Sequence, residues 1–316
     1  MENWQLILII IGAVLIGLGI IFSIFVLFFI SWRIYLGVLV RNKKEKWARG
    51  CSAPEDPSMV EMWDKGLVWG RENKDFMKVV SITNDGLKLA GEFFDFGNER
   101  TVLIIQGRSE CCKYSYFYAM PYREAGYNVL VIDTRAHGMS EGKYNTAGVK
   151  ESGDILAWCR YLHDELNQNS IILHSICVGG CGAVLALTRQ DCPEYIHKAI
   201  FDGLFITFVE SFATHMKEQG HGKSPIFYMV WFWFRVKGGV SVRKAMPIKQ
   251  IDKLRIPVLF LYGREDKYSL PAKSQILFDK CGSSEKQIKW FEHGAHSRLR
   301  LVNTKDYDAA VSNFVK

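Results

Sequence analysis

Residues 171–184 read Ile-Ile-Leu-His-Ser-Ile-Cys-Val-Gly-Gly-Cys-Gly-Ala-Val, a short apolar run followed by a stretch of small residues. The apolar run predicts a buried strand, and the glycines predict a sharp turn into a helix. A nucleophile elbow requires this strand–turn–helix context, because its strained turn lifts one side chain above the edge of a sheet. The segment therefore predicts an α/β sheet and a candidate nucleophile.

The candidate nucleophile is Cys177. With Cys177 at the turn, Ser175 lies two residues before it, and Gly179 and Gly180 lie two and three residues after it. Small residues at these positions let the turn close without a steric clash. Taking Ser175 as the nucleophile instead puts Leu173 and Cys177 two residues before and after it. These residues fit the elbow pattern poorly, unless the pattern is aligned to the chain with an insertion. A third interpretation makes Cys177 a packing residue without chemistry.

Outside this segment, strand patterns alternate with helix patterns, which is typical of right-handed βαβ units and a mostly parallel sheet. The expected strands are Met77–Thr83, Leu87–Phe94, Val102–Gln106, Tyr127–Asp133, Ser170–Ile176, Lys198–Asp202, Val258–Tyr262 and Gln287–Phe291. The expected helices are Met59–Trp69, Lys113–Ala125, Asp154–Leu166, Val178–Arg189, Ala272–Cys281 and a C-terminal helix from about Lys305. The first two strands flank Asn84-Asp85-Gly86, which predicts a hairpin turn.

One long interval, between the strand ending at Asp202 and the next strand near Ile256, breaks this alternation. It contains Pro225-Ile-Phe-Tyr-Met-Val-Trp-Phe-Trp-Phe234, the most aromatic window after the N-terminal segment. We expect a helical cap, at about residues 205–250, above the sheet. The aromatic side chains would either line a substrate site or only pack the cap onto the sheet.

The N-terminal segment has no charged residue from Leu6 to Ile30, a run of 25 residues. At about 1.5 Å per residue, a helix of this length crosses a hydrocarbon core of about 30 Å. Trp4 and Trp32 stand at its two ends, where interfacial aromatic residues are expected. A cleaved signal peptide would need a basic start and a small-residue cleavage site, whereas Glu2 is the only charge before the run. We therefore expect residues 1–40 to be a single-pass anchor.

The chain carries a formal net charge of +7, and most of it follows the anchor. Residues 33–49 hold six basic residues and one acid, a net charge of +5. The positive-inside rule then predicts a cell-membrane protein whose residues from about 41 onward are cytoplasmic, with further attraction to anionic lipid head groups. The remaining charge is nearly balanced, so no nucleic acid is expected as a partner. The basic residues are Arg33, Arg41, Lys43, Lys44, Lys46 and Arg49.

Eight scattered cysteines lack zinc-site spacing, and a chain of this size needs no disulfide staples, so free thiols in a reducing compartment are expected. The sequence has no Walker loop, no dinucleotide-binding glycine pattern and no metal-ligand cluster, so no cofactor is expected. We divide the chain into the anchor at 1–40, a basic juxtamembrane segment at 41–75 and a catalytic domain at 76–316.

Two further segments resemble a known family. They are Gly107-Arg-Ser-Glu-Cys-Cys-Lys-Tyr114 and Ala125-Gly-Tyr-Asn-Val-Leu-Val-Ile-Asp-Thr-Arg-Ala-His-Gly-Met-Ser-Glu-Gly142. They are similar to the lysophospholipase and monoglyceride-lipase branch of the α/β-hydrolases, and the resemblance covers roughly residues 76–316. The second matches the family pattern D-x-R-G-H-G-x-S-x-G with Ala136 in place of a glycine. The resemblance implies an α/β-hydrolase fold, in which Asp133 and His137 shape a turn.

The resemblance also implies a triad in the order nucleophile, acid, base. The stretch Tyr262–Pro271 resembles the family's acid loop and indicates Asp266 as the acid, with the neighbouring Glu265 as the alternative. The stretch Phe291–His296 resembles its histidine loop and indicates His296 as the base, with His293 as the alternative.

In the implied mechanism, His296 takes the proton of Cys177 or holds it in a thiolate–imidazolium pair, and Asp266 fixes the tautomer of the imidazole. The oxyanion hole would use the backbone N–H groups of Val178 and Arg108. Gln106 replaces the histidine that the family carries before its loop glycine, so this loop departs from the family pattern.

The aromatic cap and the anchor favour an apolar acyl substrate, such as a lipid ester or thioester. Three functions stay open. The first is a cysteine-dependent hydrolase of carboxylic esters or thioesters, and dienelactone hydrolases show that a Cys–Asp–His set works on this fold. The second is an acyltransferase, since the bile-acid acyltransferase branch also resembles the S-x-C-x-G pattern found here. The third is a membrane-anchored binding protein that has lost catalysis.

Overall fold

In the computed structural model, which describes residues 3–220, 222 and 224–316, an eight-stranded sheet has the order β1-β2-β4-β3-β5-β6-β7-β8. Neighbouring strands from β4 to β8 in this order are parallel, whereas β2 runs antiparallel to both β1 and β4. The mostly parallel sheet expected from the sequence is confirmed. The strands are β1 (Met77–Asn84), β2 (Leu87–Phe94), β3 (Arg100–Ile105), β4 (Asn128–Ile132), β5 (Ser170–Ile176), β6 (Ile196–Asp202), β7 (Val258–Gly263) and β8 (Lys286–Phe291).

The β1–β2 hairpin has the turn that its sequence predicts. Asn84 pairs with Leu87 across a two-residue loop. Asp85 and Gly86 both have a positive φ, of 51° and 71°. Two successive positive φ angles are the mark of a type I′ turn, whose twist matches that of the strands.

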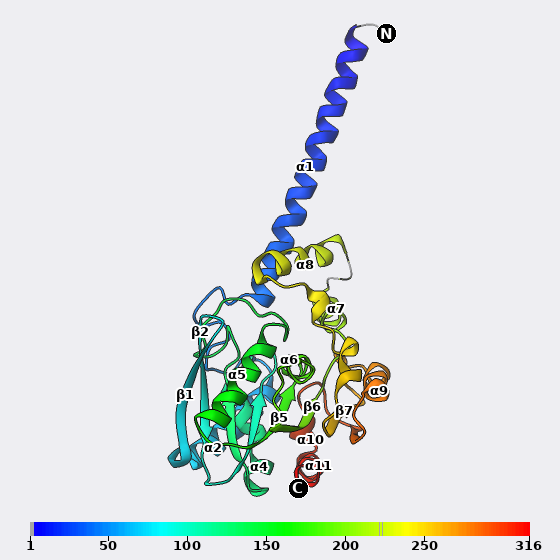
Figure 1. Ribbon diagram of the computed structural model, residues 1–316. Coiled ribbons are helices and arrows are strands. Elements are labelled where there is room, and N and C mark those ends of the chain that lie inside the picture. Colours follow the sequence, from blue (N-terminus) through cyan, green and yellow to red (C-terminus); the bar gives the residue numbers. More distant parts are fainter. Residues whose placement is uncertain (1–2, 221, 223) are drawn as a thin grey trace.

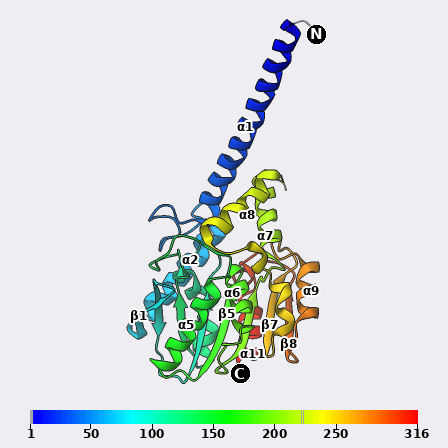
Figure 2. The ribbon, with the colours of Figure 1, turned by 45° about the horizontal axis from the view of Figure 1, so that its top comes forward.

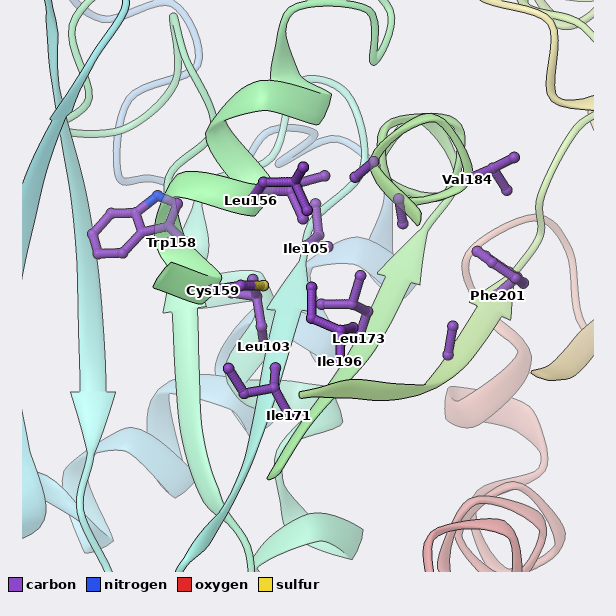
Figure 3. Packing of buried hydrophobic residues seen from close by; sticks show 14 of the residues in the cluster. Leu103, Ile105, Leu156, Trp158, Cys159, Ile171, Leu173, Val184, Ile196 and Phe201 are labelled. Atoms are coloured by element: carbon purple, nitrogen blue, oxygen red, sulfur yellow. The ribbon is translucent and has the colours of Figure 1, made fainter. Parts of the chain in front are cut away.

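One face of the sheet is covered by α5 (Glu151–Asp164) and α6 (Val178–Leu187). Figure 3 shows the side chains of Leu156 and Trp158 on α5 and Val184 on α6 in the same buried cluster as Leu103 and Leu173. All five are fully buried. Burying a side chain of this kind stabilises the fold by roughly 1.5–3 kcal/mol. This layer therefore holds the end of β5, and the turn that follows it, in a rigid setting.

The other face packs against α2 (Pro57–Glu72), α4 (Met120–Glu124) and α11 (Thr304–Val315). The single helix expected over Lys113–Ala125 is wrong. The structure instead has α3 (Cys112–Ser115), a 3₁₀ turn and then α4, which begins with Pro121 in its first turn. Proline lacks a backbone N–H and cannot continue a helix from the preceding turn, so it starts a new one here.

The interval between β6 and β7 forms the expected helical cap, made of α7 (Phe208–Glu218) and α8 (Pro225–Gly238) with three short 3₁₀ turns. Remaining short helices are α9 (Pro271–Lys280) and α10 (Leu299–Val302). The aromatic side chains Phe208, Phe212, Phe227 and Phe234 are buried in one cluster under the cap. That cluster also contains the buried C-terminal residues of α1.

Helix α1 (Asn3–Leu39) projects from the body as a long rod, and α8 crosses its base (Figures 1 and 2). By length and composition it is apolar and long enough to cross a membrane. Its last turns belong to the body, since Tyr35 and Leu39 are fully buried and the ring of Trp32 lies 4.8 Å from that of Trp233 of α8, tilted by 57°. The N-terminal part of α1, by contrast, exposes large apolar side chains such as Phe22.

Several residues of the basic segment after α1 have structural partners. The Arg49 guanidinium lies 2.5 Å from Glu92 and 3.0 Å from Asp133, both buried carboxylates. Arg41 donates to the carbonyls of Gly138 and Ser140. Lys46 donates to two carbonyl oxygen atoms at the C-terminal end of α1. The negative end of the helix dipole stabilises a cation at this place. The positive charge of this segment therefore also ties α1 to the sheet.

Candidate active site

The turn between β5 and α6 is strained at one residue. Cys177 has φ 51° and ψ −113°, a backbone conformation that costs a non-glycine residue free energy and is concentrated at functional sites. Its amide donates to the carbonyl of Asp202 at 2.9 Å, which holds the turn against the end of β6. The Cys177 thiol is free and its residue is half-buried. This is the geometry predicted for a nucleophile elbow.

Gly179 makes the turn possible. A Cβ at this position would lie 2.7 Å and 2.8 Å from the carbonyl oxygen atoms of Ile105 and Gln106, closer than side-chain carbons approach backbone. Gly107 also lies next to the turn, but a Cβ there would be 3.5 Å from the Cβ of Cys177, an ordinary van der Waals contact. The glycine two residues after Cys177 therefore lets α6 pack onto the end of β3.

Ser175, the alternative nucleophile, points away from any opening. The residue is fully buried, and its hydroxyl donates to the carbonyl of Ile200 at 3.1 Å on the neighbouring strand β6. It does not line the cavity at the elbow. Its side chain stabilises the sheet through this hydrogen bond.

Asp266 and His296 meet beside the elbow. His296 Nδ1 lies 2.7 Å from Asp266 Oδ2. The other carboxylate oxygen, Oδ1, accepts the backbone N–H groups of Tyr268 and Ser269, both at 2.8 Å. Asp266 is only 2% exposed. Its carboxylate is therefore held in one orientation, with one oxygen on the loop and the other on the imidazole.

The pKa values of this pair move in opposite directions. Burial raises the pKa of Asp266, but the charge of His296 and the hydrogen bonds outweigh it and leave the pKa below its usual value. Burial lowers the pKa of His296, yet the charges of Asp266 and Cys177 and the hydrogen bond to Asp266 raise it well above its usual value. The buried carboxylate therefore stabilises positive charge on the imidazole when it takes up a proton.

The second ring nitrogen of His296 lies on the side of Cys177. Nε2 is buried and has no partner at standard hydrogen-bond geometry in the part of the chain that the structure describes. Since the thiol is near enough to raise the His296 pKa, the two groups are neighbours without a fully formed hydrogen bond. Catalytic hydrogen bonds are often long before substrate binds.

Glu265 and His293, the alternatives for the acid and base, form a separate pair. Glu265 Oε1 lies 3.3 Å from His293 Nδ1, with the two side chains 55% and 76% exposed. Glu265 Oε2 also accepts the backbone N–H of Gly294 at 3.0 Å. This outer pair holds the histidine loop to the acid loop and does not line the cavity at Cys177.

A cavity of about 330 Å³ opens at the elbow. Cys177, Val178 and His296 lie in its wall, and α7 of the cap contributes Phe208, Phe212 and His215. The residues of this wall that the sequence did not single out include Glu110, His215, Tyr268 and Arg298. Glu110 and Tyr268 follow the loop glycine and Asp266 by three and two residues, a proximity that could have indicated them.

The two expected oxyanion donors lie at the same cavity. Val178 is the first residue of α6, so its N–H has no intrahelical partner. Within residues 3–220, 222 and 224–316, the Arg108 amide donates to no backbone or side-chain acceptor. Both residues line the cavity beside Cys177. The pair has the composition of an oxyanion hole.

The loop that departs from the family pattern is held by side chains. Gln106 is buried and donates to Thr134 Oγ1 at 3.3 Å. Asp133 accepts the N–H groups of Cys112 and Met139, which supports the turn role expected for it. Ala136, which replaces a family glycine, has φ 66°, and this positive angle explains why glycine is suited to the position.

His137 belongs to the same turn. It is fully buried, its Nδ1 lies 2.9 Å from the carbonyl of Arg135, and its Nε2 accepts the backbone N–H of Ser109 at 3.3 Å. Burial lowers the His137 pKa to about 4, so the ring is neutral. Among the described residues, no group of three His, Cys, Asp or Glu side chains is arranged to hold a metal ion.

Comparisons with known proteins find a matching family model and several similar chains. A family model described as serine aminopeptidase, S33, matches residues 235–300. The chain is 27% identical over 217 residues to the uncharacterized protein YqkD of Bacillus subtilis, covering 68% of this chain and 70% of that protein. It is 26% identical over 176 residues to protein bem46 of Schizosaccharomyces pombe, covering 56% of this chain and 54% of that protein.

A third relative is an uncharacterized membrane protein of Saccharomyces cerevisiae, YNL320W, 25% identical over 230 residues, with 70% of this chain and 74% of that protein covered. Among solved structures, the esterase Pf2001 of Pyrococcus furiosus superposes with a TM-score of 0.64 at 23% identity, covering 78% of this chain and 92% of that one. The α/β-hydrolase GrgF of a Penicillium species gives 0.58 at 16% identity, covering 76% and 98%. These likenesses show the fold.

Proposed function

We propose that this chain, an α/β-hydrolase that resembles the lysophospholipase branch and acts on ester bonds, cleaves a carboxylic ester or thioester through Cys177, His296 and Asp266. The observation that carries the proposal is the meeting of three segments at one cavity. A strained elbow presents a free thiol there, and a buried carboxylate orients an imidazole toward it. A packing cysteine would need neither.

In the first half-reaction, His296 accepts the proton of the Cys177 thiol, and the sulfur attacks the carbonyl carbon of the substrate. The tetrahedral intermediate collapses as the bond to the leaving oxygen or sulfur breaks, and His296 returns the proton to that atom. Water then attacks the acyl-thioester with His296 as general base, releasing the acid and restoring the thiol. Asp266 stabilises the imidazolium in both half-reactions.

The backbone N–H groups of Val178 and Arg108 would stabilise the negative oxygen of both tetrahedral intermediates. Each such donor contributes typically a factor of about 10²–10³ to the rate. Because both donors are backbone groups, replacing the side chain of Val178 or Arg108 leaves the N–H in place. Their role is therefore tested by substitutions that change the conformation of the loop.

The cap supports an apolar acyl group as the substrate. Phe208 and Phe212 of α7 form part of the cavity wall facing the elbow. Tyr268 lines this cavity and also a neighbouring one of about 480 Å³ between α7 and the start of α9. An acyl chain extending from Cys177 past Tyr268 would find further space there.

Membrane anchoring through α1 completes the proposal. The exposed apolar side chains of α1 continue onto α8, where Tyr228, Phe232 and Val236 are exposed and the ring of Phe232 lies 5.7 Å from that of Phe28. A bilayer around α1 would cover these residues and bring the cap to its surface. Lys43 and Lys44 are exposed beside the body, and their charge favours a cytoplasmic orientation.

The proposal is tested on the full-length chain in detergent or nanodiscs, because the last turns of α1 are part of the core. The protein, kept reduced, is incubated with short- and long-chain 4-nitrophenyl esters and acyl thioesters, quenched in acid, digested and examined by mass spectrometry. We expect an acyl mass on the peptide containing Cys177. Replacing Cys177 with Ala should remove both the adduct and turnover.

Ser175→Ala is the matched control in the same strand, two residues away. It removes one buried hydrogen bond and should retain the adduct. An adduct on Ser175, or turnover that persists in Cys177→Ala, would contradict the assignment. A folded chain without any adduct or turnover would favour the binding-protein function.

A further inference from the structure

Arg108 differs in its partners from four other buried or half-buried arginines, although the half-buried Arg41 and Arg100 also make no ion pair in the described residues and bind backbone carbonyls instead. Arg49, Arg135, Arg298 and Arg300 each contact at least one carboxylate within 4.0 Å, such as Arg135 with Asp154 at 2.7 Å. Arg108 lines the cavity at the elbow, and within the part of the chain that the structure describes it has no such ion pair. Arg108 is only half-buried, so the part of its guanidinium that lacks a partner is accessible from the cavity.

The Arg108 side chain is held by one end of its guanidinium. Nη1 donates to the carbonyl of Val38, at the end of α1, at 3.2 Å, and lies 3.4 Å from the hydroxyl of Ser109. Neither Nε nor Nη2 donates to an acceptor in the described residues. The edge formed by these two nitrogen atoms is the one that pairs with two oxygen atoms of a carboxylate or phosphate in a bidentate contact.

Nearby acids act on Arg108 only at longer range, because none of them forms an ion pair with it in the described residues. The closest acid in the loop, Glu110, uses its Oε2 to accept the backbone N–H of Gly107 at 3.1 Å, and burial raises the Glu110 pKa. Arg298, the other arginine of the cavity, is already paired with Asp56 and donates to Ser58. Arg108 therefore supplies the positive charge of this cavity that has no fixed partner.

The charge of Arg108 also acts on groups around it. Burial and then the charge of Arg108 lower the pKa of His215, on the cap side of the cavity. The same two causes lower the pKa of Lys46 to about 8. Both shifts indicate that His215 and Lys46 lie within reach of the charge of Arg108. An anion entering the cavity would therefore be attracted to it.

We propose that Arg108 binds an anionic group of the substrate through its Nε–Nη2 edge, so that the preferred substrate is an ester or thioester bearing a carboxylate or phosphate. This inference rests on the proposed function and specifies its substrate class. The Arg108 backbone N–H is a proposed oxyanion donor, so the anionic group would bind close to the scissile carbonyl. The carboxylate would belong to the acyl side and the phosphate to the leaving group.

Two matched pairs of substrates distinguish these sources. The first pair is the 4-nitrophenyl monoester of adipic acid and 4-nitrophenyl hexanoate, which differ by a carboxylate on the acyl chain. The second is 1-octanoylglycerol 3-phosphate and 1-octanoylglycerol, which differ by a phosphate on the leaving group. The measurement is the ratio of kcat/KM for the anionic substrate to that for its neutral partner, on the full-length chain.

We expect one pair to give a ratio well above one, and Arg108→Met to lower that ratio by about 10- to 100-fold, the loss typical of a charge-assisted hydrogen-bond pair. Arg108→Lys keeps the charge without the planar fork and should give an intermediate ratio. A role limited to holding the end of α1 would reduce both members of a pair equally. Arg243→Met, which changes an exposed arginine outside the cavity, is the control and should leave the ratio unchanged.

Ratios near one for both pairs, or ratios that Arg108→Met does not change, would overturn the proposal while leaving the hydrolase function intact. If no substrate is turned over, the binding of phenyl phosphate and of benzoate to Cys177→Ala is measured by calorimetry. Binding of either anion that Arg108→Met weakens at least about 10-fold would support the anion site without catalysis. Binding of the anions that is equally tight in Cys177→Ala with and without Arg108→Met would overturn the anion-site proposal.

Discussion

Two carboxylate–histidine pairs lie side by side in this molecule, and both join the loop after β7 to the loop after β8. Asp266 and His296 are 2.7 Å apart, with side chains 0% and 13% exposed. Glu265 and His293 are 3.3 Å apart and mostly exposed. The pairs are built from adjacent acids and from histidines three residues apart, so residue type does not distinguish them.

Burial and backbone donors make the difference. Asp266 receives two backbone N–H groups on the oxygen that does not face the histidine, so its carboxylate cannot rotate. Glu265 shares its oxygen atoms between a side chain and one backbone N–H at the surface, where water screens the charge. An exposed pair of this kind contributes little to stability, whereas the buried pair sets the pKa and orientation of an imidazole.

The largest expected effect separates the two histidines. His296→Ala should lower kcat/KM by a factor of about 10⁴ or more, because removing the base of a triad leaves only binding and the oxyanion hole. His293→Ala should stay within about threefold of wild type, since exposed positions outside the cavity rarely affect catalysis. Steady-state hydrolysis of a 4-nitrophenyl ester compares them. Similar losses in the two variants would remove the distinction between the pairs.

The two acids should differ almost as much. Asp266→Asn keeps the size of the side chain but favours the wrong tautomer of His296, and a rate loss of about 10³–10⁴ is expected. Glu265→Gln should retain most of the activity. The same assay measures both, with circular dichroism to verify folding. A larger loss in Glu265→Gln would instead make Glu265 the acid.

The titration of His296 tests the same comparison without catalysis. The charge of Asp266 is the largest of the causes that raise the His296 pKa, so Asp266→Asn should lower the midpoint of its NMR titration. Glu265→Gln should leave the midpoint unchanged. Because the folded pKa lies above the unfolded value, the stability from this proton is complete below about pH 6.5 and is lost as pH rises through the folded pKa. A wild-type midpoint at or below about 6.5 would contradict the buried pair.

The smallest effect concerns acid stability. Since the pKa of Asp266 is lowered in the folded state, its contribution is present above about pH 4 and is lost as pH falls through the folded value. Asp266→Asn should lower the melting temperature by several degrees at neutral pH. The difference in melting temperature between wild type and this variant should become smaller below pH 4. Glu265→Gln should change it less, and by an amount that salt reduces. Thermal scans across pH measure both. A gap that widens in acid would contradict the shift.

Much of the sheet could be predicted because its signals are local. The predicted bounds of β5 match the observed ones, and the β1–β2 turn follows from Asn84-Asp85-Gly86 between two strand patterns. The broken helix at Pro121 was missed, although proline is itself a local signal. The partners of Arg49 could not be predicted, since Glu92 and Asp133 are distant in the chain and meet it only through tertiary packing.

The sequence by itself determined the strand–turn–helix at Cys177, the small residue at Gly179 and the order of the candidate acid and base along the chain. These follow from steric limits on a turn and from short motifs. Only the tertiary structure decided which carboxylate meets His296, that Ser175 faces the sheet, and that Arg108 has no ion-pair partner in the described residues. The physical reason is that the burial, the pairing and the pKa of a side chain depend on groups that folding brings together from separate loops. The spacing of residues along the chain does not encode these contacts.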